Sequence, residues 1–335
     1  MREFGALSLS PPTGGVDRDP HGTRRPGTTV NDVAGHGDGR REVVDAHHHL
    51  LDVAGIGYSW IRDRSRVLEA LLSNYYDCAR DYGGDDYADD MSTVPLAGSV
   101  ACEFGAVDPV AEATWIQQLA DAGSGPSAFI AGVDLASPTL TETLRRYRDL
   151  PRVHAVRQPL YWAEDPLRRL GARPDYLTDP RWLAGFEQVA ADGLTWDLLV
   201  YDAQIPDTAV LLRSFPDTPI VLEAAGWPLD RSPDGFARWT ERLEFAAAHP
   251  NVALKLQGLA LIFGPSRQEI EPWVRRAVDT FGPERCMFAT HLPVDGLLWS
   301  VEALLDALSG ILADLADHEK DEFFGGCARR QYRVP

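Results

Sequence analysis

Short apolar runs of strand length alternate with longer amphipathic stretches of helical length along most of this chain. Apolar stripes at helical spacing predict helices over residues 110–122, 139–150, 180–192, 207–215, 234–249 and 267–281. Between and around them we expect strands over residues 43–49, 99–104, 128–133, 153–157, 195–200, 219–223, 252–256 and 285–290. Alternation of this kind predicts an α/β fold with a parallel sheet and helices outside it.

Eight such units are the number that closes a (β/α)8 barrel, whose active site lies at the carboxyl ends of its strands. The competing fold, a doubly wound open sheet, usually carries a Gly-x-Gly-x-x-Gly turn after the first strand. Here that position holds three histidines, His47 to His49, so we expect a single TIM barrel over residues 42–335. Residues 1–41 are rich in Gly, Pro, Thr, Asp and Arg without periodicity, and we predict a disordered extension there.

Composition excludes several classes of partner. The formal net charge of −18, without a local run of Lys and Arg, would repel nucleic-acid phosphates and anionic membrane surfaces. No apolar run is long enough to span a bilayer, and we expect a cytoplasmic protein that acts on a small molecule. The four cysteines lie far apart without a Cys-x-x-Cys pair, which indicates reduced, buried thiols. A homo-oligomer remains compatible with the sequence.

The first predicted strand ends in His47-His48-His49. Because side chains alternate along a strand, His47 and His49 should point one way and His48 the other. Two imidazoles aimed at one point are suited to hold a divalent metal such as zinc, with further ligands from neighbouring strand ends. A chance run of histidines, or a hydrogen-bonded pair in the core, would give the same spacing.

The other predicted strands also end in polar residues, which a barrel would gather into one funnel. These residues are Glu103, Arg157 with Gln158, Glu223, Lys255 with Gln257, and His291. A carboxylate such as Glu103 at the end of an interior strand needs a cation or donors beside it, either Arg157 or a metal. The alternative for Arg157 and Glu223 is a salt bridge across the barrel top, and for Lys255 a solvated head on a buried stem.

Several segments together resemble the amidohydrolase-related family of metal-dependent TIM-barrel hydrolases. They are VDAHHH (44–49), YSWI (58–61), EATWIQ (112–117), IVLEAAGWP (220–228), NVALKLQGL (251–259) and FGPERCMFATHLPVD (281–295). The branch that the chain resembles includes sugar lactonases and dicarboxylate lactonases, with aromatic-acid decarboxylases as more distant relatives. The resemblance implies a hydrolase site at the strand ends.

The chain departs from the family at two strand ends. Where the family usually has Asp-His after the sixth strand, this chain has Glu223-Ala224, and where it has Gly-Ser-Asp or Gly-Ser-Asn after the eighth, this chain has Ala289-Thr290-His291. A histidine can replace an aspartate as a zinc ligand, so His47, His49 and His291 would form a three-histidine shell with an open position for water. A metal-free site, as in some lactonases of this branch, is the alternative.

The resulting hypothesis is a hydrolase for a lactone or a related cyclic ester or amide. In it a divalent metal, zinc in the first instance, is held by His47, His49 and His291. Without metal, His291 or Glu223 would act as general base and Arg157 would stabilise the oxyanion, with Glu103 as its partner. A decarboxylase, cyclase or lyase on the same barrel, and a non-catalytic binding barrel, are the alternatives.

Overall fold

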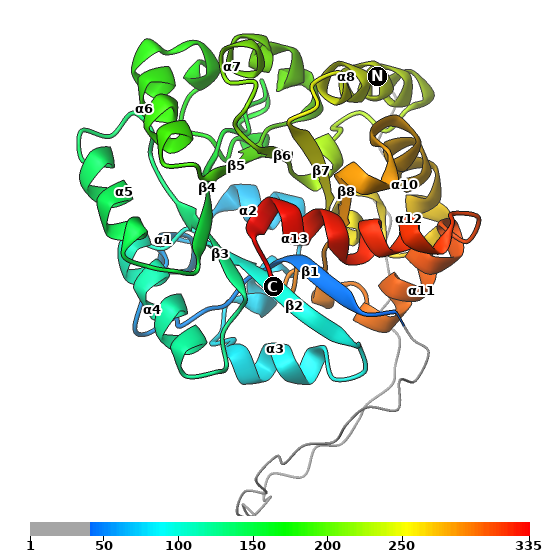
Figure 1. The fold of residues 1–335 in the computed structure, drawn as a ribbon, viewed down its shortest axis with the longest axis horizontal. Coiled ribbons are helices and arrows are strands. Elements are labelled where there is room, and N and C mark those ends of the chain that lie inside the picture. The colour runs from blue at the N-terminus through cyan, green and yellow to red at the C-terminus, as the bar shows by residue number, and fades with distance from the viewer. Residues whose placement is uncertain (1–40) are drawn as a thin grey trace, which may run out of the picture. The chain divides into compact units, whose positions relative to one another are not determined.

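The structure, a computed structural model, describes residues 41–335. Eight parallel strands follow one another around a single sheet in sequence order (Figure 1). Their bounds are β1 Val43–His48, β2 Leu96–Cys102, β3 Ala128–Gly132, β4 Val153–Pro159, β5 Thr195–Leu199, β6 Ile220–Leu222, β7 Val252–Leu256 and β8 Cys286–Phe288. The His291 N–H donates to the His47 carbonyl (2.8 Å) and the His49 N–H to the Leu292 carbonyl (2.7 Å), which brings the chain after β8 beside β1. The predicted TIM barrel is confirmed.

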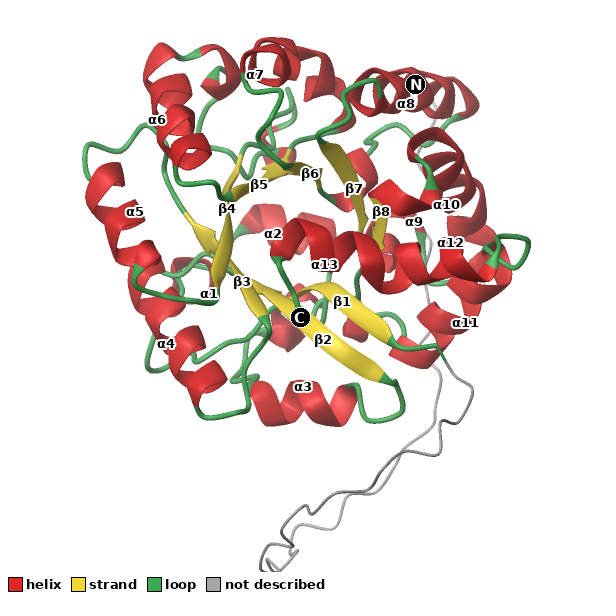
Figure 2. Ribbon diagram, viewed as in Figure 1, coloured by secondary structure: helices red, strands yellow, loops and turns green. Residues whose placement is uncertain are grey.

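Helices surround the strands on the outside (Figure 2). Those that follow β2 to β8 are α4 Pro109–Asp121, α5 Leu140–Arg148, α6 Pro180–Ala191, α7 Ala209–Ser214, α8 Pro233–Ala247, α10 Arg267–Phe281 and α11 Val301–Ile311. The six predicted helices therefore all form, and α11 is additional. Among residues 41–335 no helix is both long and apolar enough to cross a membrane.

Local sequence explains where the longer helices begin. Pro109, Pro180 and Pro233 each occupy the first helical position, where their missing N–H costs nothing. The residue before each proline, an aspartate or a serine, accepts a hydrogen bond from a backbone N–H of the first turn. These signals fix the register of α4, α6 and α8 against the strands that they connect.

Residues 77–90 are an acidic, glycine-containing stretch between α2 and β2. They include α3 Gly84–Asp90, in which Tyr87 is buried. The Tyr87 ring stacks on His48 with centroids 3.8 Å apart, and its hydroxyl donates to Asp45 at 2.9 Å. A single aromatic residue thus anchors an otherwise acidic helix to β1.

The N-terminal extension predicted over residues 1–41 lies outside the described residues, apart from Arg41 at its end. The Arg41 guanidinium donates to the Asp317 carbonyl at 3.0 Å. The remaining helices are α1 Ser59–Arg62, α2 Arg66–Leu71, α9 Leu259–Phe263, α12 Asp317–Asp321 and α13 Cys327–Tyr332.

The inside of the barrel is filled by small and medium apolar side chains from every strand except β5. They include Val44, Ala46, Val100, Ile130, Ala155, Val221, Ala253 and Met287, packed against Cys327, Ala328 and Tyr332 of α13. The C-terminal helix therefore covers the amino end of the barrel, as Figure 1 shows at the centre of the view. An active site is therefore expected at the opposite end of the barrel, where the strands have their carboxyl ends.

Candidate active site

A local irregularity in β1 directs the three histidines. Asp45 and His48 both contact Tyr87 of α3, although strict alternation would place residues three apart on opposite faces. The pairing register of β1 with β2 shifts between Asp45 and His48, which accounts for this. After the shift, His47 and His49 line the central cavity while His48 turns outward and bonds Ser99 Oγ at 3.1 Å. As predicted, the His48 side chain points away from those of His47 and His49.

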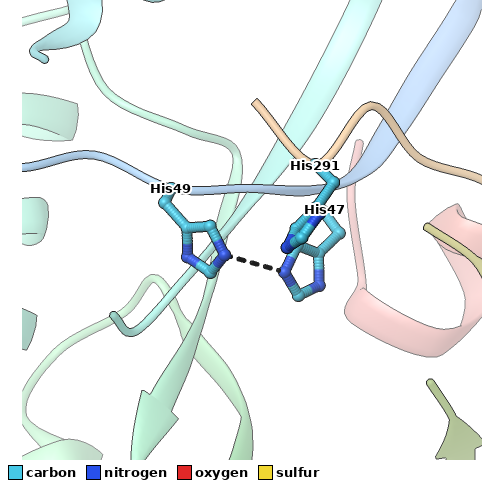
Figure 3. Close-up of side chains that lie close together, drawn as sticks. All are labelled: His47, His49 and His291. Atoms are coloured by element: carbon cyan, nitrogen blue, oxygen red, sulfur yellow. Dashed lines mark hydrogen bonds between the residues drawn. The ribbon is translucent and has the colours of Figure 1, made fainter. Parts of the chain in front are cut away.

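Three imidazoles lie close together at the carboxyl end of the barrel. His47 belongs to β1, His49 follows β1 directly, and His291 lies in the loop after β8; Figure 3 shows the three side chains gathered at one point. The Nε2 atoms of His47 and His49 are 3.2 Å apart. One ligand atom from each of the three lies within 4.8 Å of the others. A second group of this kind joins His47 with Cys102 and Glu223.

The hydrogen bonds of these imidazoles indicate which nitrogens carry lone pairs. His49 Nδ1 lies 2.9 Å from the Cys102 carbonyl and His291 Nδ1 lies 3.1 Å from an Asp295 carboxylate oxygen. Both partners accept, so each Nδ1 carries the proton and each Nε2 presents a lone pair. Burial lowers the pKa of His47 and of His49 well below the usual range, which keeps both rings neutral.

His47 completes the fit to a cation. Its Nδ1 has no hydrogen-bond partner among the described residues and lies 3.7 Å from Glu223 Oε1. With the proton on Nδ1, facing the carboxylate, its Nε2 lone pair faces the lone pair of His49 at 3.2 Å. Two ligands of a tetrahedral zinc, each about 2.0–2.1 Å from the metal, are roughly 3.3 Å apart. The donor set therefore fits a divalent metal in both chemistry and spacing.

Arg157, at the end of β4, joins the two buried carboxylates of the site. Its Nε donates to Glu103 Oε1 at 2.7 Å and its Nη1 to Glu223 Oε2 at 2.9 Å, while Nη2 reaches the Glu103 carbonyl at 2.8 Å. The other Glu103 oxygen accepts from the Gly105 N–H at 2.7 Å. Both partners suggested by the sequence for Arg157 are thus present, including the salt bridge to Glu223.

Glu223, directly after β6, is fully buried. Burial opposes its ionisation, but the charges of Arg157 and Lys255 outweigh burial and hold the pKa of Glu223 below its usual range. Gln257 Nε2 also donates to Glu223 Oε2 at 2.9 Å. The other oxygen, Oε1, has no hydrogen-bond partner among the described residues. Glu223 is therefore an ionised carboxylate with one oxygen left to accept.

Lys255 does not have a solvated head. It is completely buried inside the barrel and its Nζ contacts Asp197 of β5 and lies 3.6 Å from Glu223 Oε1. Asp197 accepts in turn from the hydroxyl of Tyr332 in α13, which lies 2.8 and 2.9 Å from its two oxygens. The sequence does not single out Asp197, because an aspartate between Trp and Leu carries no motif. A chain of polar contacts thus connects the C-terminal helix to the active-site floor.

The backbone is strained where it presents the site residues. Ala224, Ala225 and Trp227 have φ values of 54°, 52° and 22°, and His291 has 58°. L-residues rarely adopt this region, and such residues cluster at functional sites. Gln257 Oε1 accepts from the Ala224 N–H at 2.7 Å and so helps to hold the turn after β6.

The polar residues line a cavity of about 300 Å³ at the carboxyl end of the strands. Its lining includes His47, His49, His291, Glu103, Arg157, Glu223 and Gln257. Of the polar strand-end residues, Gln158 and Lys255 are not among the lining: Gln158 Oε1 accepts from the Leu135 N–H and Trp182 Nε1, and Lys255 lies inside the barrel. Aromatic side chains of the segment 58–61 pack on the body of the protein. Trp60 does so, on Phe104 with centroids 4.9 Å apart, and it also lines the cavity.

Comparison with known proteins places this geometry in a family. The model of the Amidohydrolase family matches residues 44–334. The chain belongs to this amidohydrolase family. It is an enzyme of the hydrolase type, in a family that acts on small molecules and generally uses a divalent metal.

Relatives of this amidohydrolase include an L-fucono-1,5-lactonase of Burkholderia multivorans, 27% identical over 87% of this chain and 96% of the relative. A protein of Sinorhizobium fredii named as uncharacterized is 29% identical over 87% of this chain and 98% of its own length. Among solved structures, an amidohydrolase from Burkholderia multivorans with bound zinc has a TM-score of 0.71 and 26% identity. It covers 88% of this chain and 99% of its own.

Two residues of the amidohydrolase site escaped the sequence analysis for a common reason. Asp295 orients His291 from four residues further on, and Asp45 accepts from the Thr290 N–H at 2.9 Å, which fixes the chain just before His291. Both act through another residue and carry no metal-ligand spacing of their own. The one available signal was their position directly beside the predicted ligands, in DAHHH and THLPVD.

Proposed function

We propose that this amidohydrolase hydrolyses the ring bond of a lactone, or of a related cyclic ester or amide, in a small organic molecule. The observation that carries the proposal is the pair of imidazole lone pairs held 3.2 Å apart beside an ionised carboxylate. Ester hydrolysis needs a polarised carbonyl, an activated water and a proton acceptor, and this constellation suits all three. The lactonase relatives at 25–27% identity point to the same reaction class.

In this proposal His47, His49 and His291 hold a divalent metal, zinc by preference. When bound, the metal would supply Lewis acidity, which polarises a carbonyl oxygen and lowers the pKa of water from 15.7 to about 7. The Nδ1–H bonds to Cys102 and Asp295 keep the ligand nitrogens of His49 and His291 facing the cavity.

Glu223 would accept the proton of the attacking water, and Arg157 would stabilise the negative charge that develops on the carbonyl oxygen. Glu223 Oε1, ionised and without a hydrogen-bond partner among the described residues, takes the proton of the attacking water. Three of the five Arg157 N–H groups bind Glu103 and Glu223, so its remaining N–H groups can donate to the oxyanion that forms at the carbonyl. Glu103, which receives two hydrogen bonds, holds Arg157 in place.

A metal-free version of the same reaction assigns His291 as general base. The hydrogen bond from Nδ1 to Asp295 leaves Nε2 free and would stabilise the ring once it is protonated, as in other Asp-His pairs. The two versions differ in metal content and in the behaviour of His291 variants, and are therefore separable by experiment.

The first experiment measures bound metal by elemental analysis and proton release with a panel of lactones. For His47→Ala and His49→Ala we expect loss of the metal and a fall in turnover of at least about 10²-fold. His48→Gln is the matched control from the same triplet, because His48 faces away from the cavity toward Tyr87. It should retain both metal and activity.

His291 decides between the two versions. If His291 is a ligand, the His291→Ala variant loses the metal. The His291→Asp variant, which restores the carboxylate usual in the family, should still bind the metal. If His291 is the base, metal is absent from the unaltered protein, and both variants lose about 10²–10⁴-fold in turnover while substrate still binds. The proposal fails if the metal-loaded protein releases carbon dioxide instead of protons, or turns over none of the lactones.

A further inference from the structure

The active-site cavity has two chemically different parts. Its floor is polar and consists of the histidines with Glu103, Arg157 and Glu223. The walls that lead away from the floor are apolar and include Trp60, Leu71, Leu170, Trp227, Leu261 and Ile262. All of these except Ile262 are only half-buried, so they present apolar surface to whatever occupies the cavity.

The walls of the cavity contain no cationic side chain among residues 41–335. Arg157 is the only Lys or Arg in this range that lines the cavity, and it lies on the floor, where it binds both Glu103 and Glu223. A second acidic group on the substrate, outside the ring that is cleaved, would lie against the apolar walls and would lose its hydration there without a compensating partner.

Hydrogen-bonding capacity in the walls is also limited. The hydroxyls of Tyr75 and Tyr161 have no hydrogen-bond partner in the described part of the chain, and both residues line the cavity. Gln257 is engaged at both ends, by Glu223 and by the Ala224 N–H. The other hydroxyls in the lining are those of Ser59 and Ser65, and Ser65 already accepts from the Leu68 N–H at the start of α2. These few hydroxyls stand among apolar side chains and match a sugar ring with several hydroxyls poorly. Each hydroxyl left unpaired against the leucines would weaken binding by about tenfold.

Resting on the lactone hydrolysis proposed above, we infer that the substrate is an uncharged lactone, or a related cyclic ester or amide, with an apolar body. The cleaved ring lies against the polar floor, and an aromatic or alkyl portion extends between Trp60, Trp227 and Leu261. Sugar lactones and dicarboxylates fit this cavity less well, because its walls are mostly apolar and contain no cation among the described residues.

The test compares lactones of one ring size in the metal-loaded protein, each kcat/KM being divided by the rate of hydroxide hydrolysis of the same compound. We expect dihydrocoumarin to exceed L-fucono-1,5-lactone by at least about 10²-fold, since several hydroxyls lose their partners at about tenfold each. An unbranched alkyl chain should raise kcat/KM about tenfold from δ-valerolactone to δ-nonalactone. A preference for the sugar lactone, with lactone hydrolysis intact, overturns the inference and leaves the reaction class standing.

Leu261→Lys places a cation in the wall and should weaken the preference for an apolar substrate. We expect it to lower the advantage of dihydrocoumarin at least tenfold and to raise activity toward a carboxylated δ-lactone. Val210→Lys, at a 42% exposed position in α7 away from the cavity, is the matched control and should change neither. An unchanged preference in Leu261→Lys contradicts the inference.

The inference can also be tested if no lactone is turned over, in which case the proposed reaction fails by itself. Calorimetry then measures binding of 3,4-dihydroquinolin-2-one, an uncharged lactam that resists hydrolysis, to the same protein. Binding that is lost in Leu261→Lys and kept in Val210→Lys supports an apolar, uncharged ligand. Absence of binding, or tighter binding of a polyhydroxylated lactam, overturns it.

Discussion

Arg157 holds together two carboxylates that would otherwise repel each other on the floor of the active site. Glu103 and Glu223 are both buried, and an ionised carboxylate in such a place needs a partner. The planar guanidinium serves both at once, through Nε on one side and Nη1 on the other. A lysine could not reproduce this fork, so Arg157 has a geometric role as well as an electrostatic one.

His48 gives the molecule a measurable dependence on pH. Burial lowers the pKa of His48 to about 3, whereas in the unfolded chain it is about 6.5. Above pH 6.5 the ring is neutral in both states and costs nothing. As the pH falls below 6.5 only the unfolded chain takes up the proton, so the free energy of unfolding decreases by up to about 1.4 kcal/mol per pH unit.

We therefore expect His48→Gln, which keeps a donor for Ser99 but cannot titrate, to flatten the pH dependence of stability between pH 6.5 and 4. Urea unfolding at several pH values, in metal-free protein, measures the difference in slope between the variant and the unaltered chain. Equal slopes would mean that His48 is already protonated in the native state and that burial does not keep it neutral.

At the scale of single residues, the sequence predicted the direction of a side chain better than it predicted which residue that side chain contacts. Alternation along β1 was sufficient to separate His48 from His47 and His49. The need of Glu103 for a cation was also evident, and Arg157 meets it. The burial of Lys255 against Asp197 was not predictable in the same way, because it depends on which strands lie opposite each other across the barrel.

The turn after β6 is the element in which local strain and function meet. Ala225 has φ 52° and ψ 28°, and its carbonyl accepts from Trp239 Nε1 at 2.7 Å. Left-handed backbone costs an L-residue about 1–2 kcal/mol, which glycine avoids. Replacing Ala225 by glycine would remove this cost. It would also remove a buried methyl group, worth about 0.8 kcal/mol, and give the unfolded chain more conformational freedom, and these two losses offset the relief of strain.

We expect Ala225→Gly to leave the free energy of unfolding within about 1 kcal/mol of the unaltered chain. Ala113→Gly, in the interior of α4 and also buried, is the matched control and should cost about 2 kcal/mol, because helical glycine adds about 1 kcal/mol to the lost methyl. Denaturant titration of both variants tests this. Equal losses would show that the turn stores no strain.

At the same scale, periodicity predicted the long helices and failed for short, irregular ones. Helices α4, α5, α6, α8 and α10 carry apolar stripes over several turns, which a sequence window detects. Helix α3 has seven residues, four of them aspartate, and forms because Tyr87 reaches Asp45 and His48. Contacts with residues distant in sequence stabilise this helix, so no local sequence pattern predicts it.

At the scale of the whole molecule, the barrel explains why the site was predictable at all. His49 and His291 are separated by 241 positions, yet closure of the sheet sets their ring centroids 5.5 Å apart. Once eight strand-and-helix units are counted, every strand end falls on the same rim. The shape of the cavity was not predictable, since its apolar walls come from α1, α2, α9 and the loops after β4 and β6.

Tyr332 connects the C-terminal helix α13, at the amino end of the barrel, to the charged residues inside it. Its hydroxyl lies 2.8 and 2.9 Å from the two oxygens of buried Asp197, which also contacts Lys255. Burial raises the pKa of Asp197 to about 7, so its carboxylate is charged at pH 9. At that pH we expect Tyr332→Phe to lower the free energy of unfolding by about 1.5–3 kcal/mol, because a hydrogen bond to a charged acceptor is lost in a place that water does not reach. Thermal and denaturant unfolding measure this loss.

Tyr147→Phe provides the matched control for that prediction. Tyr147 is equally buried and donates to the Gly132 carbonyl at 2.6 Å, so the same substitution there removes a bond to a neutral acceptor. It should cost only about 1 kcal/mol. If the two variants lose the same stability, the Tyr332 hydroxyl contributes no more than packing and an ordinary hydrogen bond. A larger loss in Tyr332→Phe ties the C-terminal helix to the charged interior on which Glu223 also depends, since Lys255 faces both carboxylates.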